Sequence, residues 1–482
     1  MTSVDYVTLD HSRALLSEAE LDALRRRISG GVLRAGDTGF DEARHVWNGS
    51  VDRTPALIAR CLEEADVQAC VQFAHATQML VSVRGGGHHI AGHAIAPGGL
   101  VIDLSAMRAV QIDAPARTAQ VGPGALLGDF DREAQAHGLA TPLGINSTTG
   151  VAGLTLGGGF GWLTRQHGLT IDNLLEARVV TADGRLRVAS ATSEPELFWA
   201  LRGGGGNFGI VTSFKFRLHA VGPEVYAGLV VYPFEQARQV LRAWRDFTAT
   251  SSERLSVWAV MRKAPPLPFV PASAHGTDVV IFALLYNGSA DEGKRAAAAV
   301  ASFGTPLAMA VGPTPYAGFQ TAFDPLLAAG ARNYWKSNNF DALSDDAIDV
   351  LMASAASLPG PDCEIFVAQL GAAMARVEPG ATAFVGRDAH YIMNVHGRWS
   401  DPVDDDRVRA WARAVFQRAA PHATGGGYVN FLTEDEAERV RASYGDNHAR
   451  LQAAKRRYDP TNLFRMNLNI TPAPTPMHEA TT

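Results

Sequence analysis

Hydrophobic and polar positions divide the chain into two stretches of different character. Between about residues 40 and 218, short β-branched segments alternate with helix-like segments, and glycine turns separate them. Residues 65–76 and 126–140 repeat their apolar side chains at helical spacing. The expected strands of this stretch are residues 80–84, 100–104 and 116–121. The mixed pattern predicts an α+β fold and does not fit regular βαβ repeats.

The middle of the chain, from about residue 223 to residue 385, carries longer apolar runs. The runs that begin at Val230, Ser256 and Val279 are rich in β-branched and aromatic residues, which predicts strands of a large sheet. The helical patterns between these strands are residues 236–248 and 291–302. We therefore expect the middle of the chain to form a second domain.

The composition excludes several classes of protein. The 482-residue chain carries a net charge of −6, whereas a nucleic-acid or anionic-membrane surface would need clustered Lys and Arg. No apolar run approaches the ~18 residues of a membrane span, and no signal-like segment begins the chain. The three cysteines, Cys61, Cys70 and Cys363, form no CxxC pair. We expect reduced thiols, no metal site and a cytoplasmic protein.

Three clusters contain many of the 47 glycines, namely residues 84–89, 156–162 and 202–209. Consecutive glycines let backbone N–H groups approach a pyrophosphate closely, so an acidic protein can still hold a dinucleotide. Residues 204–209 match the GxGxxG pattern, but a helix-like segment precedes them and a strand follows. A Rossmann fingerprint needs the opposite order, so this motif is rejected. For any single cluster, a tight turn is the alternative interpretation.

Four segments together resemble one family of flavoenzymes. They are residues 83–92 (VRGGGHHIAG), 150–163 (GVAGLTLGGGFGWL), 168–174 (GLTIDNL) and 458–470 (YDPTNLFRMNLNI). In this order they resemble the signatures of the berberine-bridge-enzyme-like FAD-linked oxidases, within the vanillyl-alcohol-oxidase superfold. The match runs from about Trp47 to Ile470.

The resemblance also implies an architecture. We expect a PCMH-type FAD-binding domain from residues 35–220 and a substrate-binding domain from residues 221–424, with a large antiparallel sheet covered by helices. Residues 425–475 are expected to return to the FAD-binding domain.

The resemblance implies that His88, which ends the glycine loop, bonds covalently to the 8α-methyl group of FAD. Some family members add a second bond through a cysteine, but Asn146 occupies that position here, so a single link is expected. His93 is expected to be a structural histidine, and no metal is expected beside it. The residues expected to contact the flavin are Arg84, Gly85, Gly86, Gly87, His88, His89, Asn146, Thr149, Gly150, Gly153, Gly158, Gly159, Gly161, Ile210, Val211, Tyr428 and Asn430.

Removal of a hydride from a carbon that bears OH or NH needs a base for the proton. Tyr428 lies in a Tyr-x-Asn element whose tyrosine often serves as the base in this family, although a strand tyrosine packed on the flavin is the alternative. Glu364 alternates with apolar neighbours and resembles the active-site glutamate of a bacterial family member that acts in enterocin biosynthesis. Tyr391 and Lys336 are weaker candidates on strands of the second domain.

The aromatic residues of the second domain indicate a pocket for an aromatic or polyketide-like substrate, or simply an aromatic core. They are Trp258, Phe282, Tyr286 and Trp335. The leading hypothesis is an oxidase that takes a hydride from an alcohol, hemiacetal or amine and reduces O2 to H2O2.

Three alternatives stay open: a flavin–oxygen-adduct oxygenase, a dehydrogenase with another electron acceptor, and a flavin-carrying protein without turnover. The expected partners are a small-molecule substrate and O2, with no nucleic acid and no membrane. The oligomeric state is left open.

Overall fold

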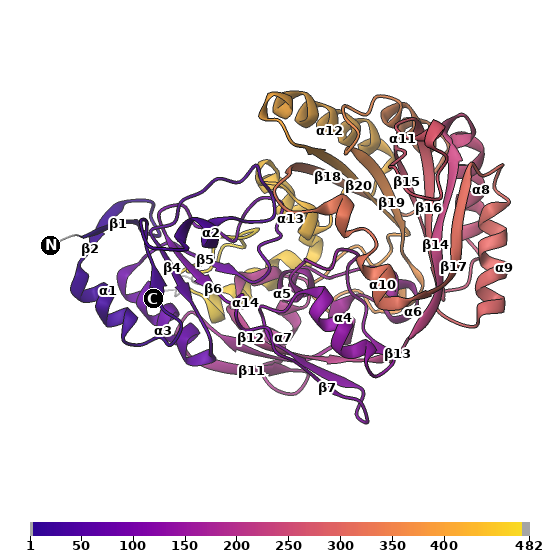
Figure 1. The fold of residues 1–482 in the computed structure, drawn as a ribbon. Coiled ribbons are helices and arrows are strands. Elements are labelled where there is room, and N and C mark those ends of the chain that lie inside the picture. Colours follow the sequence, from indigo (N-terminus) through magenta and orange to yellow (C-terminus); the bar gives the residue numbers. More distant parts are fainter. Residues whose placement is uncertain (1–2, 475–482) are drawn as a thin grey trace, which may run out of the picture.

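The computed structural model describes residues 3–474 and has two lobes (Figure 1). The first lobe contains a four-stranded and a five-stranded sheet, and the second contains a seven-stranded antiparallel sheet. The α+β fold that the sequence predicts is therefore confirmed. Within residues 3–474, no helix is long and apolar enough to cross a bilayer.

The four-stranded sheet of the first lobe leads directly into the first glycine cluster. Its strands, in spatial order, are β3 (Val32–Leu33), β4 (Leu57–Arg60), β6 (Leu100–Asp103) and β5 (Val81–Arg84). Helix α3 (Glu64–Thr77) buries Val67, Cys70, Val71 and Ala74, which are spaced three and four residues apart on one face. The predicted helix and strand at residues 65–76 and 80–84 match α3 and β5 to within one residue.

The five-stranded antiparallel sheet of the first lobe has the spatial order β11 (Leu186–Ser190), β10 (Leu174–Val180), β12 (Ile210–Arg217), β8 (Thr118–Val121) and β7 (Val110–Asp113). Helices α4 (Leu127–Gln135) and α7 (Pro195–Leu201) share its hydrophobic core. The predicted helix at residues 126–140 ends at Gln135, because Gly138 has a φ of 63° and turns the chain into β9 (Leu139–Ala140).

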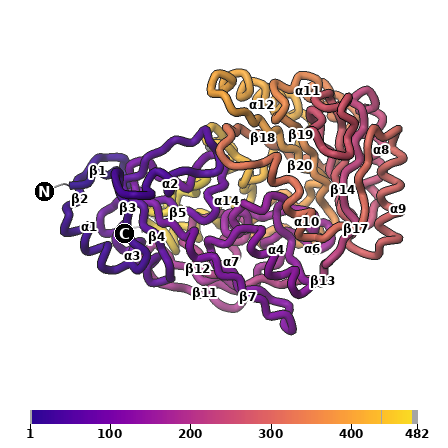
Figure 2. Tube along the Cα trace, viewed as in Figure 1, coloured from indigo at the N-terminus to yellow at the C-terminus, as the bar shows by residue number. Residues whose placement is uncertain are grey.

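Both ends of the described chain belong to the first lobe. The N-terminal elements are β1 (Val4–Val7), β2 (Arg13–Leu16), α1 (Glu18–Arg25) and α2 (Phe40–Arg44). The C-terminal helices are α13 (Ala437–Tyr444) and α14 (His448–Tyr458), and Figure 2 shows this yellow segment among the indigo and purple strands. Tyr6 and Leu16 share one buried cluster with Leu463 and Phe464. Residues 3–34 thus pack into the first lobe, although they precede the expected domain start at residue 35.

The second lobe is built on the seven-stranded sheet. In spatial order its strands are β17 (Ala308–Pro315), β14 (Glu224–Pro233), β16 (Asp278–Tyr286), β15 (Leu255–Lys263), β19 (Glu364–Gln369), β20 (Tyr391–Trp399) and β18 (Arg332–Phe340). The helices that cover its outer face are α8 (Ala237–Thr248), α9 (Ala290–Ala301), α11 (Asp345–Ala355) and α12 (Asp405–Ala419) (Figure 1). The predicted helices at residues 236–248 and 291–302 correspond to α8 and α9.

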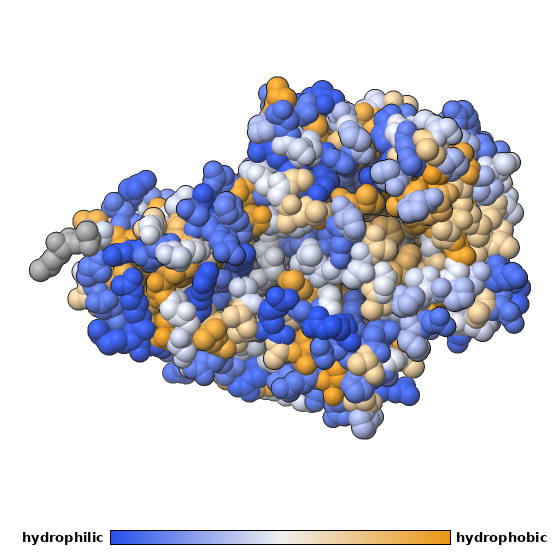
Figure 3. All heavy atoms as spheres, in the orientation of Figure 1, coloured by the Kyte–Doolittle hydropathy of each residue, from blue (hydrophilic) through white to orange (hydrophobic). Residues whose placement is uncertain are grey.

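Alternation along each strand separates the two faces of this sheet. In β15, Val257, Ala259 and Met261 pack into the core under the helices, whereas Trp258 points to the opposite face. That inner face meets α6 (Thr164–His167) of the first lobe and the loop before it, residues 160–163, which follows α5 (Val151–Leu156), and it is bordered by α10 (Tyr316–Thr321). The surface is hollowed where the lobes meet, with hydrophobic residues on the side of the second lobe (Figure 3). Side chains on the inner face are therefore placed to form a site with the first lobe.

Candidate active site

A cavity of about 320 Å³ lies between the glycine clusters and the inner face of the large sheet. The first lobe contributes the loop after β5, the loop that precedes α5, residues of α5 itself, and the start of β12. The sheet contributes Trp258, Trp335, Phe366 and His396, and the C-terminal segment contributes residues around Tyr428 and Asn467. We call this space the main cavity. Its wall combines segments that lie far apart in the sequence.

Close backbone contact between two glycine loops shapes one end of the main cavity. A Cβ on Gly86 would lie 2.5 Å from the backbone nitrogen of Gly150, so neither loop tolerates a side chain there. Gly87 has a φ of 64°, a left-handed conformation that favours glycine. In contrast, a Cβ on Gly153 or Gly206 would meet nothing within 4 Å in the described structure, and both residues line the cavity. The exposed backbone at these positions is a cradle that suits a pyrophosphate.

His88 lies at the rim of the main cavity, and two neighbouring side chains contact its ring. The ring stacks on Trp47 at 4.3 Å between centroids, and Thr148 Oγ1 lies 3.3 Å from Nε2. Burial lowers the pKa of His88 to about 3, the charge of Arg398 contributes, and a backbone hydrogen bond partly offsets the shift. His88 is therefore a neutral imidazole at physiological pH, and only the neutral ring offers a nucleophilic lone pair.

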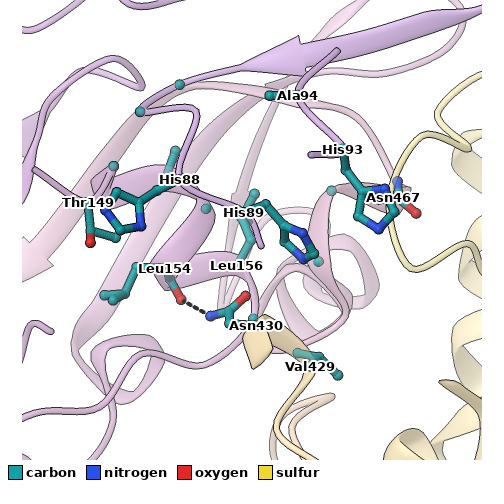
Figure 4. Close-up of a pocket in the computed structure, with 18 of the residues that line it drawn as sticks. His88, His89, His93, Ala94, Thr149, Leu154, Leu156, Val429, Asn430 and Asn467 are labelled. Carbon is teal, nitrogen blue, oxygen red and sulfur yellow. Dashed lines mark hydrogen bonds between the residues drawn. The ribbon is translucent and has the colours of Figure 1, made fainter. Parts of the chain in front are cut away.

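His89 and His93 continue the same loop toward Asn467 (Figure 4). The two rings lie 4.6 Å apart, and burial lowers the pKa of His89 to about 4. Among residues 3–474, His93 Nε2 and Asn467 Oδ1 have no hydrogen-bond partner, although both residues line the cavity. Unpartnered polar atoms on residues that line a cavity fit a polar ligand such as a dinucleotide. No group of three or more His, Cys, Asp or Glu in the described chain is arranged to hold a metal ion.

Tyr428 and Asn430 form a fixed hydrogen-bonded pair beside α5. Tyr428 Oη accepts hydrogen bonds from Gly159 N and Asn430 Nδ2, each at 2.9 Å. Asn430 Nδ2 also donates to the carbonyl of Leu154 at 3.1 Å (Figure 4). Burial raises the pKa of Tyr428 to about 12, although these two hydrogen bonds lower it in part. At neutral pH Tyr428 is a protonated phenol whose oxygen already accepts two hydrogen bonds, and this weakens the case for it as a base.

Most residues predicted to contact the flavin line the main cavity. They are Gly85, Gly86, Gly87, His88, His89, Asn146, Thr149, Gly150, Gly153, Ile210, Val211, Tyr428 and Asn430.

Four other predicted contacts do not line it. The Arg84 guanidinium bonds the carbonyl of Ala43. A Cβ on Gly158, Gly159 or Gly161 would meet Phe384, Thr170 or the Leu143 carbonyl within 3.0 Å. These three glycines permit close packing beneath the cavity rather than contact with a ligand.

Lys336 and Tyr391 do not reach the main cavity, which corrects their assignment as candidate catalytic residues. Lys336 Nζ pairs with Asp435 Oδ1 at 2.8 Å, and Tyr391 Oη lies 2.9 Å from Thr248 Oγ1 of α8. Successive side chains of a strand point to opposite faces. Trp335 faces the cavity, so its neighbour Lys336 points away from it, and Tyr391 belongs to the core under the helices.

The predicted aromatic pocket divides in the same way. Phe282 and Tyr286 belong to the core beneath the helices, whereas Trp258 and Trp335 line the cavity. Phe282 and Tyr286 thus form part of an aromatic core, whereas a pocket for an aromatic substrate beside Trp258 and Trp335 stays a prediction.

Glu364 does face the inner side, where it forms part of a buried charged cluster. Arg262 Nη1 donates to Glu364 Oε2 at 2.6 Å, and His396 Nδ1 lies 3.0 Å from Glu364 Oε1. Burial alone would raise the pKa of Glu364, but the charge of Arg262 and the hydrogen bond from His396 outweigh it and lower the pKa to about 2. Glu364 is therefore a carboxylate at any physiological pH.

A side recess of about 60 Å³ opens beside this cluster and shares residues with the main cavity. The shared residues are Ile145, Trp258, Leu327, Phe366 and His396. Its other walls are mostly apolar, with the side chains of Leu229, Val260, Leu267, Ile281 and Phe323, and its charged residues are Arg262 and Glu364. This recess offers an apolar space beside a few polar groups, as small-molecule sites commonly do.

The structure adds residues that the sequence analysis did not assign to the site. They include Trp47, Gly205, Gly206, Asn207, His396 and Asn467. His396 could have been found from its strand, because Asn394, His396 and Arg398 recur at every second position and therefore share one face.

Comparisons with known proteins agree with this geometry. The sequence matches the FAD binding domain family over residues 55–190 and the berberine and berberine-like family over residues 427–471. It is 31% identical to an FAD-linked oxidoreductase of Dictyostelium discoideum over 448 residues, which cover 92% of this chain and 95% of that protein. It is also 31% identical to (R)-6-hydroxynicotine oxidase of Paenarthrobacter nicotinovorans, over 92% of this chain and 97% of that enzyme.

A solved structure has the same fold over nearly its whole length. Xylooligosaccharide oxidase from Myceliophthora thermophila, in complex with xylobiose, superposes with a TM-score of 0.84 at 25% sequence identity. The alignment covers 95% of this chain and 100% of that structure. The arrangement of two lobes around the cavity is therefore shared with an oxidase.

Proposed function

The chain belongs to the berberine-bridge-enzyme-like FAD-linked oxidoreductases of the PCMH-type FAD-binding family, and from this premise we propose that it is an oxidase with one FAD bound covalently to His88. In this proposal the substrate is a small, largely apolar alcohol or amine, and O2 is the electron acceptor. When bound, the flavin supplies the acceptor for a hydride and passes two electrons to O2.

The environment of His88 is the observation that carries the covalent link. The ring lies at the rim of the main cavity, is oriented by Trp47 and Thr148, and stays neutral because burial lowers its pKa. Attachment to the flavin methyl group needs this neutral nucleophile. His89 and His93 lie farther along the loop, toward Asn467 (Figure 4).

The cysteines support a single link. Cys61, Cys70 and Cys363 are all fully buried, and none of them lines the main cavity, whereas Asn146 does. Asn146 cannot form a thioether, so its place in the cavity wall supports one covalent bond rather than two.

The side recess supports an apolar substrate. Trp258 stacks on Trp162 at 4.3 Å and on Phe366 at 6.0 Å, which gives the recess a rigid aromatic border. One relative is an oxidase of hydroxynicotine and another of xylooligosaccharides. The mostly apolar walls favour a ring or short hydrocarbon over a sugar, whose hydroxyl groups would lose their hydrogen bonds there.

Acid precipitation of the purified protein tests the covalent link. We expect the yellow colour to stay with the pellet in the wild type and to pass into the supernatant, or to be absent, in His88→Ala. His89→Ala is the matched control and should keep its colour in the pellet. Colour that leaves the wild-type pellet would contradict the proposal.

A panel of alcohols and amines tests the oxidase activity. Aromatic and short aliphatic alcohols and amines should give one H2O2 for each O2 consumed, and xylobiose should give less. Transfer of ¹⁸O from labelled O2 into the product would instead identify an oxygenase. A flavin that the substrate reduces quickly but that air reoxidises only slowly would identify a dehydrogenase.

A further inference from the structure

His396 occupies the junction between the main cavity and the side recess. It lies on β20, and the residue is 5% exposed. The imidazole stacks on Trp335 with centroids 4.4 Å apart and an angle of 15° between planes. Phe366 meets its edge at 4.9 Å and 84°. Two aromatic rings from neighbouring strands thus fix the plane of the imidazole.

The hydrogen bond to Glu364 determines which nitrogen of His396 carries the proton. Glu364 is ionised and a carboxylate only accepts hydrogen bonds, so Nδ1, 3.0 Å from Oε1, must be the donor. In the neutral ring the other nitrogen, Nε2, then holds the free lone pair. Nε2 is buried and has no hydrogen-bond partner in the part of the chain that the structure describes. A proton acceptor is therefore presented at the junction of the two spaces.

Arg262 keeps this arrangement in place. It holds Glu364 Oε2 at 2.6 Å and has a side-chain exposure of 8%, so the pair is shielded from solvent. Both oxygens of Glu364 are hydrogen-bonded, one by Arg262 and the other by His396. Glu364 is therefore poorly placed to accept a further proton, but well placed to stabilise a positive charge on His396. The stacked indole of Trp335 favours the same charge.

The other groups at this end of the cavity do not offer a free base. Tyr428 is a protonated phenol whose oxygen accepts two hydrogen bonds. Trp258 and Trp335 have only indole N–H groups, which donate. Both oxygens of Glu364 already accept hydrogen bonds, from Arg262 and His396. Among these residues, His396 is the one with an unpartnered lone pair, and it lines both the main cavity and the side recess.

We propose that His396 Nε2 is the catalytic group that takes the proton from the substrate hydroxyl or amine, and that Glu364 and Arg262 are positioning residues that hold it for this task. This inference rests on the proposed oxidase function. The substrate would lose a hydride from its carbon, for which the bound flavin would supply the acceptor, while the O–H or N–H proton moves to Nε2 and a C=O or C=N bond forms. Formation of H2O2 from O2 then consumes two electrons and two protons, and His396 returns its proton in that half of the cycle.

A chromogenic phenol tests this assignment without knowledge of the substrate. 4-Nitrophenol carries one hydroxyl on an aromatic ring that suits the side recess, and its phenolate is yellow whereas the neutral phenol is not. The holoenzyme is titrated with it at a pH below the pKa of the free probe, and the difference spectrum is recorded against the holoenzyme alone. A proton that moves to His396 leaves the bound probe as phenolate.

The variants separate His396 from its neighbours. We expect the phenolate band in the wild type, its loss in His396→Gln, and its retention in His390→Gln, since His390 is an exposed histidine on the preceding loop. In Glu364→Gln we expect a weaker band at the same pH, because the neutral amide no longer stabilises the imidazolium that forms when His396 takes the proton. The charged groups that face His396 are Glu364 on β19, Arg262 on β15 and Arg398 on its own strand. A band that survives in His396→Gln, or a wild type that shows none, would overturn the proposal.

The rate of flavin reduction gives a second measurement. The colour of the acid pellet shows whether the proposed function or only the role of His396 has failed. With an alcohol or amine found in the H2O2 panel, the rate of flavin reduction in His396→Gln should fall by about 10²- to 10⁴-fold, as for loss of a general base. Every variant should still give a yellow acid pellet. A colourless wild type would refute the proposed function itself, whereas a yellow, fully active His396→Gln enzyme would refute only the role of His396.

Discussion

The two walls of the main cavity are built by different means. On the glycine side, the backbone defines the surface: Gly86 and Gly150 approach so closely that no Cβ fits between them. On the sheet side, side chains define the surface, because Trp258, Phe366 and His396 project into the cavity from strands of the large sheet. The first wall fits a cofactor common to a whole family, and the second can vary with the substrate. Four predictions, from the largest expected effect to the smallest, test this difference.

Loss of Glu364 should be the most damaging single change on the sheet side. Glu364→Ala leaves the buried Arg262 without its carboxylate, and removal of one partner of a buried ion pair costs about 3–5 kcal/mol. Chemical denaturation should show this loss in the free energy of unfolding. Glu364→Gln keeps a hydrogen-bond acceptor and should lose less. An alanine variant as stable as the wild type would show that the ion pair between Glu364 and Arg262 does not stabilise the fold.

On the glycine side, the backbone contact itself can be broken. A Cβ in Gly86→Ala lies 2.5 Å from Gly150 N, and overpacking of this kind destabilises a protein by about 3 kcal/mol. Gly153→Ala is the matched control, because its Cβ meets nothing within 4 Å in the described residues. We expect the control to unfold like the wild type but to bind less FAD, since the methyl group enters the cavity. Equal stability of the two variants would contradict the backbone account.

Tyr428 joins the two walls and distinguishes support from catalysis. Tyr428→Phe removes the acceptor for Gly159 N and leaves that buried donor unpaired, at a cost of about 2 kcal/mol. If His396 is the base, flavin reduction in this variant should stay within about tenfold of the wild-type rate, while stability falls. A loss of rate as large as that in His396→Gln, without a loss of stability, would return the role of base to Tyr428.

The last prediction concerns the pH dependence that Glu364 gives to stability. Its folded pKa of about 2 lies below the ordinary value of 4.5, so its stabilising contribution is fully present above pH 4.5. The contribution is lost as the pH falls through the folded value. The difference in unfolding free energy between the wild type and Glu364→Gln should therefore shrink between pH 4.5 and pH 2. A difference that is constant across this window would contradict an ionised Glu364.

The same contrast explains what the sequence could predict. Backbone geometry depends on glycines, and glycines are visible in a sequence, so the sequence predicts the loops that contribute Gly85, Gly86, Gly87, Gly150 and Gly153 to the cavity wall. Gly158, Gly159 and Gly161 are also glycines, but they allow close packing and do not line the cavity. Only the positions of Phe384, Thr170 and Leu143 in the structure show this difference.

The sheet side was less predictable, because a shift of one residue reverses which face a side chain occupies. Glu364 and His396 line the side recess, whereas Lys336 pairs with Asp435 and Tyr391 contacts Thr248 on the opposite face. The pairing of strands β19 and β20 brings Glu364 opposite His396, and this long-range register is not visible in the sequence of either strand.

Mass spectrometry of the peptide that carries His88 tests the central claim most directly. Trypsin cleaves after Arg84 and Arg108 and releases residues 85–108. We predict that this peptide carries the mass of one FAD, that fragmentation places the flavin on His88, and that residues 85–108 are unmodified in His88→Ala. An unmodified wild-type peptide from yellow holoenzyme, or a flavin on His89 or His93, would contradict the account.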